Sequence, residues 1–170
     1  MKVSDNVFPK LRLAEVAAPA TPAAGELVVY AKADGKLYYK NDDGTERAIG
    51  VAVNSIIAAA SDETTAITAG TAKLTFRMPY AMLLTDVRAS LTTPQTGGSV
   101  VTVDVNENGA SILSTKLTID NGEKTSTTAA TPRVISDANL ADDAEITIDV
   151  DQVGDGTAKG LKVSLIGVPV

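Results

Sequence analysis

The stretch "SVVTVDVN", Ser99 to Asn106, alternates valine with polar residues and decides the fold class. Successive side chains of a strand point to opposite faces, so Val101, Val103 and Val105 are predicted to lie inward. Five further stretches repeat this period: "KLTFRM", "LLTDVRASLT", "LSTKLTID", "EITIDVDQ" and "LKVSLIG". Turn residues separate them, and no helix-length amphipathic segment intervenes. The pattern predicts an all-β chain folded as an antiparallel, jelly-roll-like β-sandwich.

The same alternation predicts which side chains form the core and which face water. In "LLTDVRASLT", Leu83 and Val87 are placed inward and Leu84 outward. The predicted core comprises Leu74, Phe76, Val87, Val101, Val103, Val105, Leu117, Ile119, Ile146, Ile148, Val163 and Leu165.

Residues before the sandwich divide into three predicted parts. Residues 1–25 form an extended arm, because Pro19 and Pro22 disfavour helix, and its Leu11, Leu13 and Val16 are too few to make a core. Residues 26–50 form a β-hairpin or meander, in which Asp34-Gly35 predicts a two-residue type I′ turn. Residues 51–65 are predicted to be a linker, and residues 66–170 the sandwich.

Composition argues against several classes of function. The 170 residues carry a formal net charge of −6, which disfavours nucleic acid and anionic membranes as partners. There is no cysteine, histidine or tryptophan, which removes thiolate metal sites and the common nucleophile–base pairs. No apolar stretch is long enough to cross a bilayer, and "MKVSDNVFPKLRL" lacks the apolar region of a signal peptide. We therefore expect cytoplasmic synthesis of a soluble protein without membrane insertion.

No motif predicts an enzyme or a cofactor. "DVNENG", Asp104 to Gly109, matches the start of a calcium loop but lacks its closing glutamate, so Asn108-Gly109 is interpreted as a hairpin turn. Weak calcium binding near Asp104 or Asp149 stays open. A carboxylate-based glycosidase would have Asp137, Asp142 and Asp143 at its disposal, but these are interpreted as charged turn residues.

The order of segments resembles small structural proteins of tailed bacteriophages, of the tail-fibre, minor-tail and head-fibre kind. The resemblance rests on "LRLAEVAAPATPAAGELVVYAKADGKLYYKNDDGTERAIG", "SDETTAITAGTAKLTFRMPYAMLLTDVRASLTT", "SILSTKLTIDNGEKTSTTAATP" and "DDAEITIDVDQVG". It implies a virion protein, a small fibre or spike, whose arm docks on capsid or tail proteins while the sandwich contacts a host-surface glycan or protein. It implies no catalytic or cofactor-binding residues.

Two other functions fit the same sequence features, and the resemblance also implies an assembly state. A capsid decoration protein would stabilise the shell without touching a host. A carbohydrate-binding module would expose Tyr38, Tyr39 or Tyr80 in a shallow site. Fibres of the resembled kind are usually three-fold, so a homotrimer is expected. Its candidate subunit interface consists of apolar residues on the nominally wet faces, namely Leu84, Val100, Ile112 and Ile166.

Overall fold

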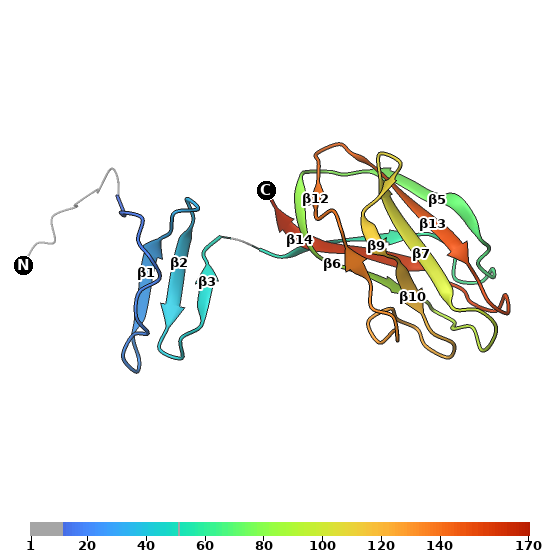
Figure 1. Cartoon of the computed structure of the whole chain (residues 1–170), viewed down its shortest axis with the longest axis horizontal. Coiled ribbons are helices and arrows are strands. Elements are labelled where there is room, and N and C mark those ends of the chain that lie inside the picture. Colours follow the sequence, from blue (N-terminus) through green and yellow to red (C-terminus); the bar gives the residue numbers. More distant parts are fainter. Residues whose placement is uncertain (1–11, 51) are drawn as a thin grey trace, which may run out of the picture. The chain divides into compact units, whose positions relative to one another are not determined.

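The computed structural model describes residues 12–50 and 52–170, and it divides the chain into two compact units, Met1–Val51 and Ala52–Val170. Figure 1 shows the strands of both units, and the described residues contain no helix. The all-β fold class predicted from the alternation is confirmed. No described segment is a helix that could cross a membrane.

The N-terminal unit, called the module below, is a three-stranded antiparallel meander. Its strands, in the order β1-β2-β3, are β1 (Leu27–Ala31), β2 (Leu37–Asn41) and β3 (Glu46–Ala48). The first turn differs from the predicted type I′ turn. Lys32 N donates to Lys36 O at 3.1 Å, and of the loop residues only Gly35 has a positive φ, of 75°. The connection is therefore a three-residue loop that ends in a left-handed glycine.

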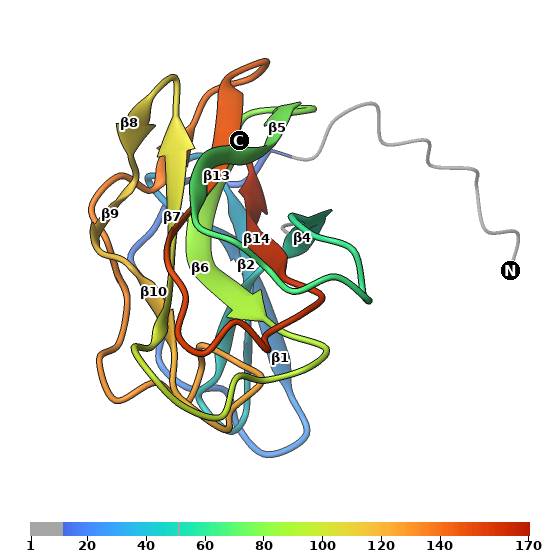
Figure 2. The same ribbon diagram turned by 90° about the vertical axis from the view of Figure 1, so that its right-hand side faces the viewer.

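The second unit is a sandwich of two antiparallel sheets. Figure 2 shows β7, β9 and β10 along one side of it and β14 and β4 toward the other. One sheet has the order β10-β7-β13-β5 with β8 added to β7, the other has the order β12-β6-β14-β4, and β9 pairs with β11. The strands are β4 (Asn54–Ala59), β5 (Gly70–Arg77), β6 (Met82–Ser90), β7 (Val101–Glu107), β8 (Ala110–Ser111), β9 (Leu113–Thr115), β10 (Leu117–Ile119), β11 (Val134–Ile135), β12 (Asn139–Leu140), β13 (Glu145–Gln152) and β14 (Lys162–Pro169).

The core between these sheets agrees closely with the predicted one. Ten of the twelve predicted residues are completely buried, while Leu74 and Phe76 are half-buried and pack against the others. Both belong to β5, which is an edge strand and is covered less fully than the centre of its sheet. Asn108-Gly109 is the predicted hairpin turn between β7 and β8, with φ values of 49° and 84°. Two positive φ angles are the type I′ geometry.

A β-bulge in β6 reverses the predicted facing of two leucines. Asp86 lies opposite Ile166 and Leu84 lies opposite Gly167, so Thr85 is an extra residue on β6. Leu84 consequently points into the core and is 5% exposed, whereas Leu83 is 38% exposed. The predictions of an inward Leu83 and an outward Leu84 were wrong.

The candidate subunit interface changes accordingly. Ile112 is 1% exposed because its backbone bonds to Val105 and Ser136 enclose it between β7 and the segment after β11. Leu84 and Ile112 thus pack within their own chain and are absent from its surface. Val100 and Ile166 are half-buried and accessible. The patch predicted from four residues is reduced to two.

The predicted linker is also partly wrong. Residues 54–59 within it form β4, which pairs with β14 from Asn54 opposite Gly167 to Ala59 opposite Lys162. The sandwich therefore begins at β4, before the predicted boundary at residue 66. Backbone pairing with the last strand of the chain explains why an alanine-rich stretch without clear alternation becomes a strand.

Candidate functional site

The described part of the predicted arm lies against the module. Glu15 forms a parallel bridge with Ala31, and Val16 N donates to Ala31 O at 2.9 Å. Further along, Lys40 Nζ donates to Pro19 O at 3.0 Å. Leu13 and Val16 remain 40% and 47% exposed, and Leu11 lies outside the described residues. The arm therefore extends the edge of β1 while its apolar side chains stay accessible.

One face of the module is closed by a polar and aromatic cluster. Tyr30, which is 5% exposed, donates its hydroxyl to Glu46, and Lys32 Nζ lies 2.6 Å from Glu46 Oε1. The Tyr30 and Tyr38 rings stack with centroids 6.1 Å apart, and Lys32 lies 4.5 Å from the Tyr38 ring centre. Burial and the Glu46 carboxylate raise the pKa of Tyr30 to about 12. This face is occupied by its own side chains.

The opposite face of the module carries exposed apolar side chains around one exposed cation, Arg47, which lies opposite Tyr39. We call it the apolar face, and it consists of Leu27, Val29, Leu37, Tyr39 and Ile49. Cross-strand register brings them together, since Val29 lies opposite Tyr39 and Ile49 N donates to Leu37 O at 2.7 Å. The four aliphatic members are 41–54% exposed. These side chains lie on β1, on β2 and in the segment after β3, and the β3 residue on the same face is Arg47. A cluster of exposed apolar side chains typically marks a contact with another surface.

The three tyrosines of the sugar-binding alternative do not form an exposed platform. Tyr38, Tyr39 and Tyr80 are all half-buried. Tyr38 is covered by the stacked Tyr30, and Tyr80 packs against the sandwich core with its hydroxyl 3.3 Å from Asn54 Nδ2. Sugar rings bind to open aromatic faces, so the positions of Tyr38 and Tyr80 weigh against that alternative. Tyr39 lies on the apolar face.

The carboxylates considered for calcium bond to donors of the protein. Asp104, predicted to face solvent, is 5% exposed, because Ser111 Oγ at 2.6 Å and Lys116 Nζ at 3.0 Å cover it. Lys116 also lies 2.6 Å from Asp151, and both carboxylates raise the pKa of Lys116. Asp149 accepts bonds from the Ala72 amide and the Asn106 side chain.

The acidic residues of the described chain do not gather into a metal site. In the residues that the structure describes, there is no group of three or more carboxylates that could hold a metal ion. Asp137, Asp142 and Asp143 are exposed and lie in connections, and Asp137 accepts the amide of Asn139 at 3.0 Å. Their arrangement is that of turn residues.

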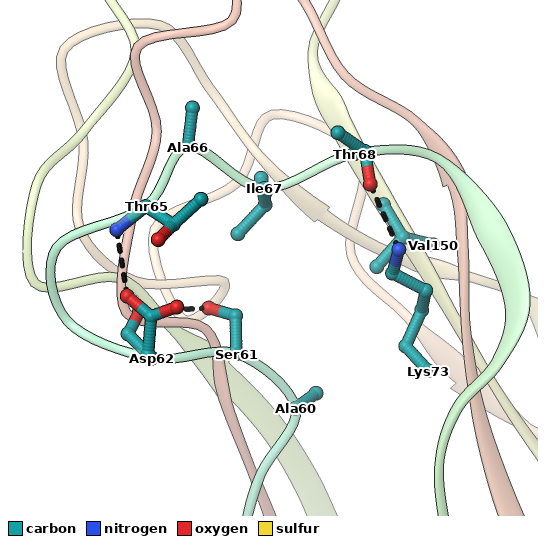
Figure 3. Close-up of a pocket in the computed structure, with 9 residues that line it drawn as sticks. All are labelled: Ala60, Ser61, Asp62, Thr65, Ala66, Ile67, Thr68, Lys73 and Val150. Atoms are coloured by element: carbon teal, nitrogen blue, oxygen red, sulfur yellow. Dashed lines mark hydrogen bonds between the residues drawn. The ribbon is translucent and has the colours of Figure 1, made fainter.

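A small pocket of about 210 Å³ lies beside the start of β5 (Figure 3). Figure 3 shows Asp62 and Lys73 at opposite ends of it. Backbone amides of Thr64 and Thr65 bond to Asp62 Oδ1 and hold the pKa of that carboxyl well below its usual range. Lys73 Nζ donates to Thr68 Oγ1 at 2.8 Å. The pocket is smaller than typical ligand sites of roughly 300–1,000 Å³.

The sequence alone does not indicate the pocket beside β5 or the apolar face of the module. The pocket loop crosses the predicted boundary between the linker and the sandwich at residue 66. The apolar face lies in the predicted hairpin, for which the sequence indicates no exposed side. Leu27 and Val29 alternate with Val28 and Tyr30, so both sides of β1 are apolar in sequence.

Comparison of the chain with protein-family models, curated proteins and solved structures found no match. The apolar face and the adjoining arm are therefore the best candidate for a functional surface.

Proposed function

We propose that this chain is a structural protein of a bacteriophage virion, a small surface fibre or spike. Its arm and module attach it to other virion proteins, and its sandwich is displayed for contact with the host surface. The apolar face is the observation that carries the proposal. The segment resemblance to phage fibre and minor tail proteins supports the virion as its location.

The distribution of exposed apolar side chains favours the module as the attachment part. Of the eleven large apolar residues that are exposed, six lie within residues 12–50, which are 39 of the 158 described residues. Among residues 12–50, Tyr30 is the only large residue that is buried. A small sheet of this kind is marginal by itself, so contact with a partner surface would stabilise it.

The sandwich, by contrast, has a closed core of its own. Its two sheets bury twenty-four hydrophobic residues in one cluster. A domain that folds without help from a partner can be exposed on a particle, and its loops and outer faces remain free for binding. A capsid decoration protein is the close alternative, since it would use the same attachment without a host contact.

Assembly as a homotrimer is part of this expectation and rests on the resemblance. Of its candidate interface, Val100 and Ile166 are accessible. Light scattering of the purified protein measures the mass directly. A monomer mass at micromolar concentration would contradict assembly of the free protein.

Incorporation into particles tests the proposed attachment. Replacing Leu27 and Val29 by serine removes half of the exposed aliphatic side chains of the apolar face, and the chain should then fail to join phage particles. The matched control is Val134→Ser, which changes a 50% exposed residue of the sandwich and should leave incorporation unchanged. Normal copy number of the doubly substituted chain would refute attachment through this face.

Binding to host cells separates the fibre from the decoration protein. Purified protein should bind intact host cells if the sandwich is a receptor-contacting domain. Absence of binding at any concentration, together with normal incorporation, would favour decoration. Gene order offers an independent check, because neighbouring genes should encode capsid or tail proteins.

A further inference from the structure

The sandwich leaves one strand edge long, uncharged and open. Within the described chain, β4 pairs only with β14 and forms the edge of its sheet. Its sequence NSIIAA contains neither a charged residue nor a proline. Natural proteins usually protect such an edge, because its unpaired N–H and C=O groups can pair with another chain.

The other edges of the two sheets are short or protected. β10 and β12 span only three and two residues. β5 is long, but it carries Lys73 and Arg77, and a bulge with Ala72 at a φ of 48° interrupts its regular pairing with β13. These features discourage pairing at β5. β4 has none of them.

The hydrogen-bonding pattern identifies which groups of β4 are free. Ala60 N donates to Leu161 O at 2.9 Å, so Ala60 bonds toward β14. In an antiparallel pair such residues alternate along the strand. The N–H and C=O groups of Ser55, Ile57 and Ala59 therefore point outward from the edge. The side chains of all three are exposed, and that of Ile57 is 65% exposed.

We infer that β4 pairs with β4 of a second copy of this chain, antiparallel about a two-fold axis at Ile57. Ser55 then lies opposite Ala59 of the second copy, and Ile57 lies opposite its own equivalent. Each facing pair exchanges two bonds, so three pairs give about six backbone hydrogen bonds. The free N–H and C=O groups of β4 in one copy are all hydrogen-bonded to the equivalent groups of β4 in the other copy.

The side chains around this axis suit a second copy. β4 contains no charged residue, so pairing with its own copy brings no like charges together. Repulsion between like charges is the usual obstacle when a strand pairs with itself. The two Ile57 side chains contact each other on the outer face of the joined sheet. Ile166 lies on the neighbouring β14, opposite Ser55, and extends the apolar contact on that face. This inference goes beyond the proposed function, since it holds for any role of the sandwich. It gives a two-fold dimer of the free chain in place of the homotrimer that the resemblance implies.

Single cysteines test the register directly, because the chain contains none of its own. In a hydrogen-bonded antiparallel pair, facing Cα atoms are about 5.5 Å apart, which lies within the range of a disulfide. Full-length Ile57→Cys should therefore form a disulfide-linked dimer under mild oxidation. Ser55→Cys is the matched control. Its Cα is displaced by about 13 Å from its equivalent, four residues along the strand, so it should stay unlinked.

A mixture of Ser55→Cys and Ala59→Cys chains should give the cross-linked heterodimer, since these two positions face each other. Equal rates of cross-linking for Ile57→Cys and Ser55→Cys would overturn the inference. Absence of cross-linking for Ile57→Cys would also do so.

Light scattering of the full chain supplies a second readout. Ile57→Lys places two ammonium groups opposite each other and should convert a dimer to a monomer, with the circular dichroism spectrum unchanged. Val134→Lys, also at an exposed apolar position, should leave the dimer intact. A trimer mass that Ile57→Lys does not alter, or a monomeric unsubstituted chain at tens of micromolar, would refute pairing through β4.

Discussion

Replacing Val103 by aspartate tests the register on which the sandwich depends. Val103 is 0% exposed at the centre of β7, opposite Leu117 on β10 and Val150 on β13. Its neighbour Thr102 points to the other face of the same strand and is half-buried. The two positions therefore form a matched pair, and a one-residue shift would exchange their environments.

The magnitude follows from the burial of the side chain. Val103→Ala removes two methyl groups and should lower the free energy of unfolding by about 2–3 kcal/mol. Val103→Asp adds about 2–4 kcal/mol for burying a polar carboxyl group. Keeping that group protonated at pH 7, about three units above its ordinary pKa, adds about 4 kcal/mol. The sum of about 8–11 kcal/mol is comparable to the whole stability of a 119-residue unit, roughly 6–18 kcal/mol.

Urea unfolding followed by far-ultraviolet circular dichroism measures these differences. Val103→Asp should be unfolded or nearly so at pH 7. Burial raises the pKa of the new carboxyl in the folded state, so its penalty should shrink as the pH falls from 7 toward 4. Thr102→Asp should change the unfolding free energy by less than about 1 kcal/mol. A larger loss for Thr102→Asp than for Val103→Asp would show that the assigned register is wrong.

Three further substitutions probe other parts of the sandwich. Lys116→Met should lower the free energy of unfolding in urea by about 1–2 kcal/mol, because it leaves the buried Asp104 carboxylate without its cation, although Lys116 itself is 43% exposed. The carboxylates raise the pKa of Lys116 above 10.5, so the stabilisation that Lys116 provides should be complete below pH 10.5 and should be lost at higher pH. The stability of Lys116→Met, measured against pH, should not show this decrease at high pH. Gly167→Ala should lose about 1–3 kcal/mol in the same assay, because a Cβ there would overlap the Leu83 carbonyl; an unchanged urea midpoint would contradict that packing. Ala72→Gly should raise the thermal midpoint by relieving a φ of 48°, a strain of about 1 kcal/mol, and a lower midpoint would contradict the strain.

The fold could be predicted because the alternation in its central strands is strict. β7 and β13 change from apolar to polar at nearly every residue, and their valines and isoleucines are completely buried. A period of two needs no information from distant residues. The inner face of each strand therefore follows from its own sequence, as Val103 and Ile148 illustrate.

The errors occur where distant residues decide the local structure. The bulge at Thr85 is set by the pairing of β6 with β14, where Gly167 permits close approach of the Leu83 backbone. β4 lacks a clear alternation because Ser55 and Ala59 are small, and it becomes a strand only by pairing with β14. Neither effect has a signal within the segment itself.

The apolar face shows why the candidate site was the least predictable part. Leu27 and Val29 on one side of β1 are as apolar as Val28 and Tyr30 on the other, so periodicity alone assigns neither side to the interior. The choice follows from Tyr30, which is buried because Glu46 lies within reach on β3 and accepts its hydroxyl. Once that side is closed, Leu27 and Val29 are left exposed. A small sheet that closes one face over polar contacts leaves the aliphatic side chains of the other face, with Arg47 among them, exposed to solvent. The proposed attachment to another protein would cover these side chains and stabilise a sheet that is marginal by itself.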